Sequence, residues 1–407
     1  DCSKHVKCCN TGTAFATHRS VLRLHRHENP ATIHLSIDPC HCLTLSRTIP
    51  MLSNEAATHL IRNFDLKGEV IDFTPLGNGH IHHTWLLTLD TADRYVFQNI
   101  NTDVFQNLDA MMDNMNRVTA HINSRRHGSR RWQSLRPQTD MTGAPLHKTE
   151  DDDRWRCCAF VEKTTCHDRA DSEDVAYQAG RGFGMFQADL ADLSGERLHD
   201  TLPRFHDTPW RFACLDKAIA NDAFGRCANA RTEVDFARSN QTLASTLMDL
   251  HAQGDIPERV THNDTKINNI LLDAETNEPV CVVDLDTVMP GLSLYDFGDL
   301  IRSAAGSVSE DHPAAEEMHL CPNIYTQIAK GFLDGADGLL LPIEVELMPF
   351  SAKLITLEIG VRFLTDYLEG DHYFNTTHEH QNLERCRTQF ALAASIASQE
   401  KALQATA

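Results

Sequence analysis

The segment "VTHNDTKINNILLD", residues 260–273, concentrates polar side chains between two apolar stretches. His262, Asp264, Lys266 and Asn269 fall within eight residues, and the chain then continues into a strand-like run. Polar groups packed this densely are an unfavourable way to build a turn, because each one that is buried needs a hydrogen-bond partner. We therefore interpret the segment as a functional site.

A second segment supplies the groups that the first one lacks. After a predicted hairpin turn, "DAETNEP", the chain enters "VCVVDLD" (residues 280–286), an apolar run that ends in two aspartates. The carboxylate of Asp264 can orient a hydroxyl nucleophile and accept its proton. An amide oxygen and a second carboxylate, from Asn269 and Asp284, suit Mg²⁺ held against nucleotide phosphates. The two segments together predict phosphoryl transfer.

The composition excludes several classes of function. The chain has 407 residues, enough for about two or three domains, and a formal net charge of -20. This charge argues against nucleic acid or an anionic membrane surface as the main partner, although a nucleotide can still bind through a metal cation. No run approaches the ~18–20 apolar residues that span a bilayer. The 13 cysteines are an odd number without an apolar leader, so we expect free thiols and a cytoplasmic protein.

Residues 1–50 carry "CC" and "CHC" clusters but no sustained helical or strand period. The clusters suggest a metal site, yet no C-x-x-C pair with a matching partner pair is present. We favour the alternative, a disordered or non-native extension before a true start at Met51.

The first part of the remaining chain is expected to form a small sheet with two helices. The expected elements are a helix from Ser53, two strands joined by the glycine turn "GNG", a third strand in "RYVFQNI", a helix over residues 108–122 and a strand in "RWRCCAFVE". We expect this part, residues 51–163, to bind the nucleotide.

The second part, residues 164–407, is expected to be mostly helical and to carry catalysis and acceptor binding. Its apolar periodicity predicts long helices at residues 172–193 and 232–253, and further helices beyond Leu300. The fold class is therefore predicted to be α+β, with a small antiparallel-sheet lobe and a larger helical lobe.

The pattern H-x-D-x4-N, a hairpin, then two apolar residues and Asp resembles the aminoglycoside phosphotransferase and choline kinase superfamily. Within it, the chain is most similar to the N-acetylhexosamine 1-kinase group. The segments that carry the resemblance are "PLGNGHIHHT", "YVFQNINTDVF", "HNDTKINNILLD", "CVVDLDTVMPG", "YDFGDLIR" and "RFLTDYLEGDHYF". They are spread over most of the chain except its first fifty residues. The resemblance implies a protein-kinase-like two-lobe fold.

The resemblance also implies roles for individual residues. Asp264 would be the catalytic base, and Asn269 and Asp284 the Mg²⁺ ligands. Asp286 would be either a second metal contact or a residue that bonds nearby backbone. Lys266 could offset the charge of the transferred phosphoryl group, the alternative being an exposed surface lysine.

Three polar residues near the site are interpreted as structural. We expect His262 to be a packed histidine and Asp296 to hold the catalytic loop through backbone hydrogen bonds. The sequence "DFG" that contains Asp296 is not the metal-binding triplet of protein kinases, because Asp284 already fills that role. Asp299 is expected to be structural as well.

The nucleotide, ATP by default, would lie under the glycine turn. Gly77, Asn78 and Gly79 would offer backbone N–H groups to its phosphates. Kinases of this fold usually carry a basic residue on the next strand. Here Gln98 stands in that place and is followed by Asn99, so phosphate neutralisation must come from Mg²⁺, Lys266 or a more distant arginine.

The purine would pair with the extended connector "FVEKTT", through backbone groups near Glu162 and Thr164. The closest resemblance implies that the acceptor is the anomeric hydroxyl of N-acetylglucosamine or N-acetylgalactosamine. Sugars bind to planar polar groups over aromatic rings. The candidate acceptor residues are Arg362, Asp366, Tyr367, Asp371, His206 and Asp207, each of which could instead belong to a packed or solvated helix face.

Two alternatives stay open. The acceptor could be another small alcohol, such as an aminoglycoside, choline or homoserine, and the acidic surface would favour a cationic one. The chain could also be a nucleotide-binding pseudoenzyme, given Gln98 and Asn99, although Asp264, Asn269 and Asp284 argue against that.

Overall fold

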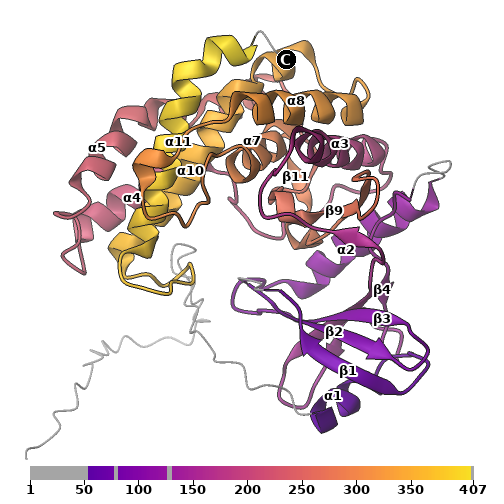
Figure 1. The fold of residues 1–407 in the computed structure, drawn as a ribbon. Helices are drawn as coiled ribbons and strands as arrows, with labels where there is room; N and C mark the ends of the chain where they lie inside the picture. The colour runs from indigo at the N-terminus through magenta and orange to yellow at the C-terminus, as the bar shows by residue number, and fades with distance from the viewer. Residues whose placement is uncertain (1–53, 78–80, 126–130, 405–407) are drawn as a thin grey trace, which may run out of the picture. The chain divides into compact units, whose positions relative to one another are not determined.

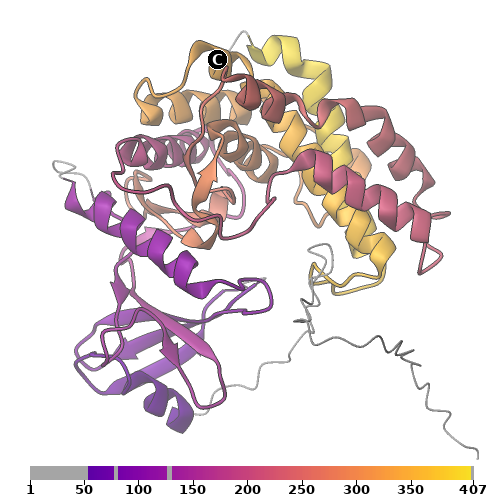
Figure 2. The ribbon, with the colours of Figure 1, turned by 180° about the vertical axis from the view of Figure 1, so that it is seen from behind.

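The computed structural model describes residues 54–77, 81–125 and 131–404, and all of them belong to one unit of the chain. Asn78 and Gly79 of the predicted phosphate loop, and the predicted extension at residues 1–50, lie outside the described residues. Figure 1 shows the sheet grouped with α1, the other helices grouped together, and α2 running between the two groups; Figure 2 shows the same order from behind.

The first group is an antiparallel sheet in the strand order β1-β2-β3-β6-β4, with β5 also paired to β6. The strands are β1 (Val70–Pro75), β2 (His83–Leu89), β3 (Arg94–Asn99), β4 (Pro137–Gln138), β5 (His147–Lys148) and β6 (Arg154–Ala159). Alternate residues of β2 point inward, so that Trp85, Leu87 and Leu89 are buried. They pack with α1 (Asn54–Ile61) and with Phe97 of β3, as the alternating sequence predicted.

Helix α2 (Leu108–Ser124) connects the sheet to the helical part. Asn107 caps it by accepting the N–H of Ala110 at 3.1 Å. Its predicted apolar face is buried in the large core of the helical part. Asn114 donates to the carbonyl oxygens of His199 (2.8 Å) and Val288 (3.0 Å), which lie far along the chain. The helix is therefore anchored on the catalytic side of the molecule.

Helices form most of the remaining chain, which confirms the predicted α+β fold with two lobes. They are α3 (Glu173–Leu190), α4 (Thr208–Asn221), α5 (Arg231–Asn240), α6 (Thr246–Gln253), α7 (Ser293–Ala304), α8 (Pro322–Ala336), α9 (Pro342–Glu346), α10 (Met348–Glu369) and α11 (Gln381–Gln404). No helix in the described residues is long and apolar enough to cross a membrane.

Helices α3 and α8 pack unusually closely because glycines face each other across the contact. A Cβ atom on Gly184 would lie 2.2 Å from the carbonyl oxygen of Phe332, and one on Gly331 would lie 2.0 Å from that of Tyr177. These distances are far below van der Waals contact, so only glycine permits this approach. Helix α3 supplies residues beneath the catalytic loop, and its position therefore depends on these glycines.

One predicted helix is wrong. Residues 232–253 do not form a single helix, because α5 ends at Asn240, a 3-10 turn follows, and α6 begins at Thr246. Ser239 and Asn240 donate their side chains to the carbonyl oxygen of Phe236, at 2.8 and 2.9 Å. Side chains of this kind compete for backbone groups and favour helix ends.

Two small sheets flank residues 262–269, the segment that contains Asp264, Lys266 and Asn269. Strand β9 (Ile270–Asp273) pairs with β10 (Pro279–Val282) and with β7 (Thr164–Thr165). Strand β8 (Arg259–Thr261) pairs with β11 (Met289–Gly291). The residues between β8 and β9, and those between β10 and β11, are therefore two loops that leave neighbouring small sheets.

Candidate active site

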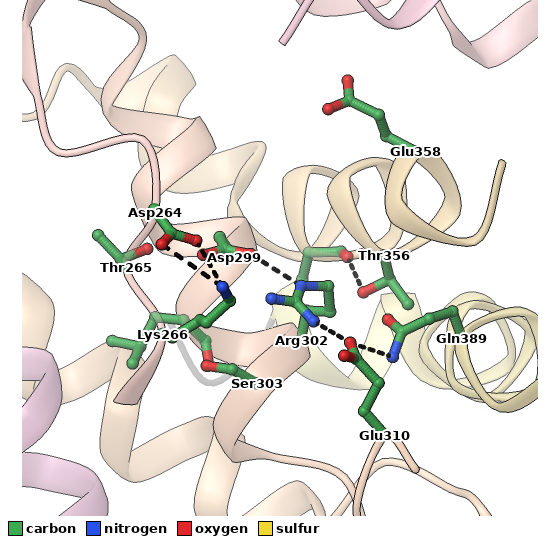
Figure 3. Close-up of polar contacts among 12 residues, drawn as sticks. Asp264, Thr265, Lys266, Asp299, Arg302, Ser303, Glu310, Thr356, Glu358 and Gln389 are labelled. Atoms are coloured by element: carbon green, nitrogen blue, oxygen red, sulfur yellow. Dashed lines mark hydrogen bonds and ion pairs between the residues drawn. The ribbon is translucent and has the colours of Figure 1, made fainter. Parts of the chain in front are cut away.

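The catalytic loop, residues 262–269, joins β8 to β9. Within it, Asn269 donates through Nδ2 to the backbone oxygen of Asp264 at 2.8 Å and to Oδ2 of the same residue at 3.3 Å. Lys266 places its Nζ 3.2 Å from Oδ1 of Asp264 (Figure 3). The structure thus brings three of the predicted residues together around one carboxylate.

Residues from outside the loop hold its backbone. Asp296 of α7 accepts the N–H of His262 at 3.0 Å and that of Asn263 at 2.7 Å, and Gln187 of α3 donates to it at 2.7 Å. This confirms the predicted role of Asp296. Asn263 has a positive φ of 66°, a strained conformation for a residue other than glycine, and these bonds fix it there.

His262 is structural, as predicted. Its side chain is fully buried against the rings of Phe183 and Phe186. Its Nε2 lies 2.8 Å from the carbonyl oxygen of Val283, the residue that precedes Asp284. The histidine therefore ties the two functional loops together and does not face the site as an acid or base.

Asn269 and Asp284 lie side by side on the hairpin. Ile270 pairs with Val282, and the N–H of Val283 donates to the carbonyl oxygen of Asn269 at 2.9 Å. Among the described residues, no donor bonds the carboxylate of Asp284 or the Oδ1 of Asn269. Burial, with the nearby charges of Asp286 and Asp264, raises the pKa of Asp284.

Two oxygen-bearing side chains without donors fit a Mg²⁺ ion, which prefers oxygen ligands and keeps several waters. The described residues contain no cluster of three His, Cys, Asp or Glu side chains that could hold a metal. Asn269 and Asp284 would therefore share the ion with phosphate oxygens and water, as nucleotide sites commonly do.

The prediction that Asp286 bonds nearby backbone is wrong, and the alternative of a second metal contact stays a prediction. Both carboxylate oxygens accept hydrogen bonds from Arg156, one of them at 2.8 Å. His82 Nε2 lies 2.7 Å from Oδ2. Burial alone would raise the pKa of Asp286, but Arg156 and His82 hold it below its ordinary value. The partners lie in the sheet lobe, where sequence spacing could not reveal them.

The charges around Asp264 favour its ionised form. Burial raises its pKa, but Lys266, His262 and Arg302 outweigh that effect and lower it. In turn, Asp264 raises the pKa of Lys266. Figure 3 shows Arg302 next to this pair, bonded to Asp299 at 2.8 Å, so the structural interpretation of Asp299 is confirmed. Asp264 is therefore held in its ionised form.

The predicted nucleotide-binding residues lie on the sheet and the connector. Gly77 has a φ of 69°, the left-handed conformation that glycine favours, and open space where a Cβ would be. Gln98 is bonded to the side chains of Thr84 and Arg156. Thr164 begins β7, paired with the end of β9.

The connector is already held by hydrogen bonds. The side chain of Glu162 pairs with Arg94, and its carbonyl oxygen accepts from Arg131. Thr164 donates its hydroxyl to the carbonyl oxygen of Val161 at 2.9 Å. These bonds fix the connector in the place where the purine was predicted to bind, although its backbone is not extended throughout, because Lys163 has a positive φ of 54°.

Most of the predicted sugar contacts near the end of α10 are wrong. Asp366 accepts the N–H groups of residues 372, 373 and 374 at 2.8–2.9 Å, and Asn382 at 2.8 Å, so it holds a loop. Asp371 forms an ion pair with Arg226. Tyr367 is fully buried, and its hydroxyl bonds a histidine of the same loop at 3.0 Å.

His206 and Asp207 are structural too. His206 is buried between the Oε1 of Glu358 and the carbonyl oxygen of Asn263, 2.9 Å from each. Asp207 caps α4 by accepting the N–H of Trp210 at 3.0 Å. His206 therefore holds the catalytic loop from outside and is not available to a sugar.

Arg362 of α10 remains a candidate, and the structure adds Arg211, which the sequence analysis missed. Arg362 lies over the ring of Phe205, 5.3 Å from its centroid, and donates to the hydroxyl of Tyr373 at 3.3 Å. Arg211 donates to the carbonyl oxygen of Phe205 at 2.9 Å, and its buried Nε has no partner among the described residues. Burial and the charge of Arg362 lower the pKa of Arg211 to about 10.

Solved structures of several small-molecule kinases resemble this fold. An aminopropanol kinase associated with a microcompartment is 15% identical, over 86% of this chain and 99% of that one, with a TM-score of 0.53. Amicoumacin kinase, solved with AMP-PNP and Ca²⁺, is 12% identical, over 83% and 93%, with a TM-score of 0.56. Choline kinase from Cryptosporidium parvum is 11% identical, over 86% and 96%, with a TM-score of 0.55.

At such low identities these structures show the fold alone, the protein-kinase-like two-lobe fold that the sequence predicted. The family assignment comes from the sequence itself. The model of the phosphotransferase enzyme family, APH, matches residues 72–320, more than half of the chain. The chain therefore belongs to the APH phosphotransferase family, and it is a phosphotransferase that acts on an alcohol group.

Proposed function

We propose that the protein transfers the γ-phosphoryl group of ATP to a hydroxyl of a small, uncharged sugar. The observation that carries the proposal is the group formed by Asp264, Asn269 and Asp284. It combines an ionised carboxylate with two side chains, of Asn269 and Asp284, whose oxygens accept no hydrogen bond from the described residues. Bound Mg²⁺, held by Asn269 and Asp284, would neutralise phosphate charge.

In the proposed reaction Asp264 accepts the proton of the acceptor hydroxyl. The acceptor oxygen bonds the γ-phosphorus as the bond from that phosphorus to the ADP oxygen breaks. Lys266, 3.2 Å from Asp264, supplies positive charge close to the transferred group. The phosphates would lie against the turn that contains Gly77, Asn78 and Gly79, and the purine against the connector near Glu162.

The arginine pair favours an uncharged acceptor over a cationic one. Arg211 and Arg362 form no ion pair with any described carboxylate, although the chain carries a net charge of -20. Two neighbouring guanidinium groups repel an ammonium group, although the carboxylate of Glu358 lies near Arg211, and they suit hydroxyl and carbonyl oxygens. Phe205, which contacts both, precedes His206, and His206 bonds the loop residue next to Asp264. An N-acetylhexosamine, phosphorylated at its anomeric hydroxyl, meets these requirements.

A panel of acceptors tests the proposal by ADP release. We expect turnover with N-acetylglucosamine or N-acetylgalactosamine, and none with the methyl glycoside of either sugar, in which the anomeric hydroxyl is blocked. Choline, homoserine, aminopropanol and an aminoglycoside complete the panel. Turnover with a cationic acceptor alone would overturn the assignment of the sugar. Magnesium-dependent ATP binding without transfer to any compound would instead favour a pseudoenzyme.

A further inference from the structure

The strand position that lacks a basic residue has an arginine directly opposite it. Gln98 of β3 pairs in register with Arg156 of β6. Arg156 is buried, with 2% of its surface exposed, and its Nε donates to the Oε1 of Gln98 at 2.9 Å. The glutamine therefore orients a cation that comes from the neighbouring strand.

The other end of Arg156 reaches the loop that carries Asp284. Its two terminal nitrogens bond the two carboxylate oxygens of Asp286, which lies 130 residues further along the chain. His82, just before β2, bonds the same carboxylate at 2.7 Å, and the N–H of Asn101 fixes that histidine at 3.0 Å. Strand β6 and the residue that precedes β2 thus converge on Asp286.

This contact determines which of the two aspartates can receive a cation. Asp286 is 1% exposed and accepts three donors, whereas Asp284 accepts none from the described residues. Asp284 also has a positive φ of 59°, so the loop needs an external anchor to keep its carboxylate in place.

We propose that Arg156 is a positioning residue for cation binding: by holding both oxygens of Asp286 from the sheet, it fixes Asp284 as the free carboxylate. The inference rests on the proposed role of Asp284. It also assigns a function to the glutamine that replaces the usual basic residue. In this chain the positively charged side chain on the sheet, Arg156, acts through the metal-binding loop. It is not a free group that contacts phosphate.

The test is direct binding of Mn²⁺, in place of Mg²⁺, in the presence of AMP-PNP, followed by electron paramagnetic resonance. Arg156→Gln leaves Asp286 buried without its main partner, and that variant could fail to fold. The double variant Arg156→Gln/Asp286→Asn removes both charges together, so that neither buried charge is left without its partner. We expect its thermal midpoint to stay near that of the wild type.

For this double variant we expect Mn²⁺ affinity to fall about tenfold, as when residues that support metal ligands are changed. AMP-PNP affinity without the cation and KM for the acceptor should stay within about twofold, because both oxygens of Asp286 are occupied by Arg156 and His82. Arg156→Lys, which keeps the charge but not the two-pronged contact, should recover part of the loss. A folded double variant with wild-type Mn²⁺ affinity would overturn the proposal.

Arg259 and Glu344 provide a matched control. They form a partly buried pair with the same two-pronged geometry, with one contact at 2.8 Å. Arg259→Gln/Glu344→Gln should leave Mn²⁺ affinity unchanged. Asp284→Asn tests the metal site itself. If this variant binds Mn²⁺ normally, the proposed metal site is wrong. If Asp284→Asn loses Mn²⁺ affinity and Arg156→Gln/Asp286→Asn does not, only the role of Arg156 fails.

Discussion

The catalytic loop (residues 262–269) and the loop after α10 (residues 370–375) have similar sequences in one respect: both are rich in Asp, Asn and His. They use these side chains in opposite ways. The catalytic loop has its backbone held from outside, chiefly by Asp296 and His206. The second loop is held by Asp366, a residue from the end of the helix that leads into it.

The difference determines which polar residues are available for chemistry. The carboxylate of Asp264 is bonded only by Lys266 and Asn269 of its own loop, and the Oδ1 of Asn269 has no donor among the described residues, because other residues satisfy the backbone around them. Asp366 has none to spare, since four N–H donors share its two oxygens. A dense cluster of polar residues indicates a functional site only where a different part of the chain holds the loop.

The same substitution at Asp264 and Asp366 should separate the two loops. For Asp264→Asn we expect kcat to fall by a factor of about 10³, within the range of general-base catalysis, because the amide cannot accept the hydroxyl proton. Binding of AMP-PNP and the free energy of unfolding should change little, since the two side chains have the same shape. Initial rates of ADP release and calorimetric titration measure these quantities.

Retention of more than about a tenth of the wild-type kcat would rule out Asp264 as the base. A large loss of stability in the same variant would show that the carboxylate is structural, which would remove the contrast with Asp366.

The sequence predicted those features that depend on local spacing. The strands of the sheet, α2, and the convergence of Asp264 and Asn269 all follow from patterns within twenty residues. The role of Asp296 was also predictable, because an aspartate that lies next to a catalytic loop can accept hydrogen bonds from the backbone N–H groups of that loop.

Features that join distant segments were not predictable. Arg156 gives no local signal that it bonds Asp286, 130 residues away, and Arg211 lies in an ordinary amphipathic helix. From the sequence alone, the glycines of α3 and α8 indicate only a low helix propensity. Their role follows from the contact between the two helices. The sugar contacts assigned to the end of α10 failed because sequence shows which groups are polar but not which already have partners.

Asp366→Asn should have the second-largest effect, and on a different quantity. The variant loses the charge-assisted bonds that hold the loop, which should lower the free energy of unfolding by about 2 kcal/mol. We expect kcat and KM for the acceptor to stay within about twofold of the wild type, because Asp366 is buried and both its oxygens already accept hydrogen bonds within the protein. Urea unfolding and steady-state kinetics are the measurements. A raised KM with unchanged stability would restore Asp366 as an acceptor contact.

The smallest effect should come from His206→Gln, and it should depend on pH. Burial lowers the pKa of His206, but Glu358 and the carbonyl oxygen of Asn263 outweigh it and raise the pKa above its ordinary 6.5. Stability from the charged histidine is therefore fully present below 6.5 and is lost as the pH rises through the raised value. The pKa of Glu358 is lowered from 4.5, so its share of the stability is lost when the pH falls below that range.

The wild type should therefore exceed His206→Gln in unfolding free energy by the largest margin, about 1.5 kcal/mol, between these two ordinary values. The margin should shrink toward alkaline pH, where both proteins carry a neutral side chain beside Glu358. Urea unfolding at a series of pH values measures it. A margin that stays constant with pH would mean that His206 holds Asn263 as a neutral donor, and the catalytic loop would then be anchored without a buried ion pair.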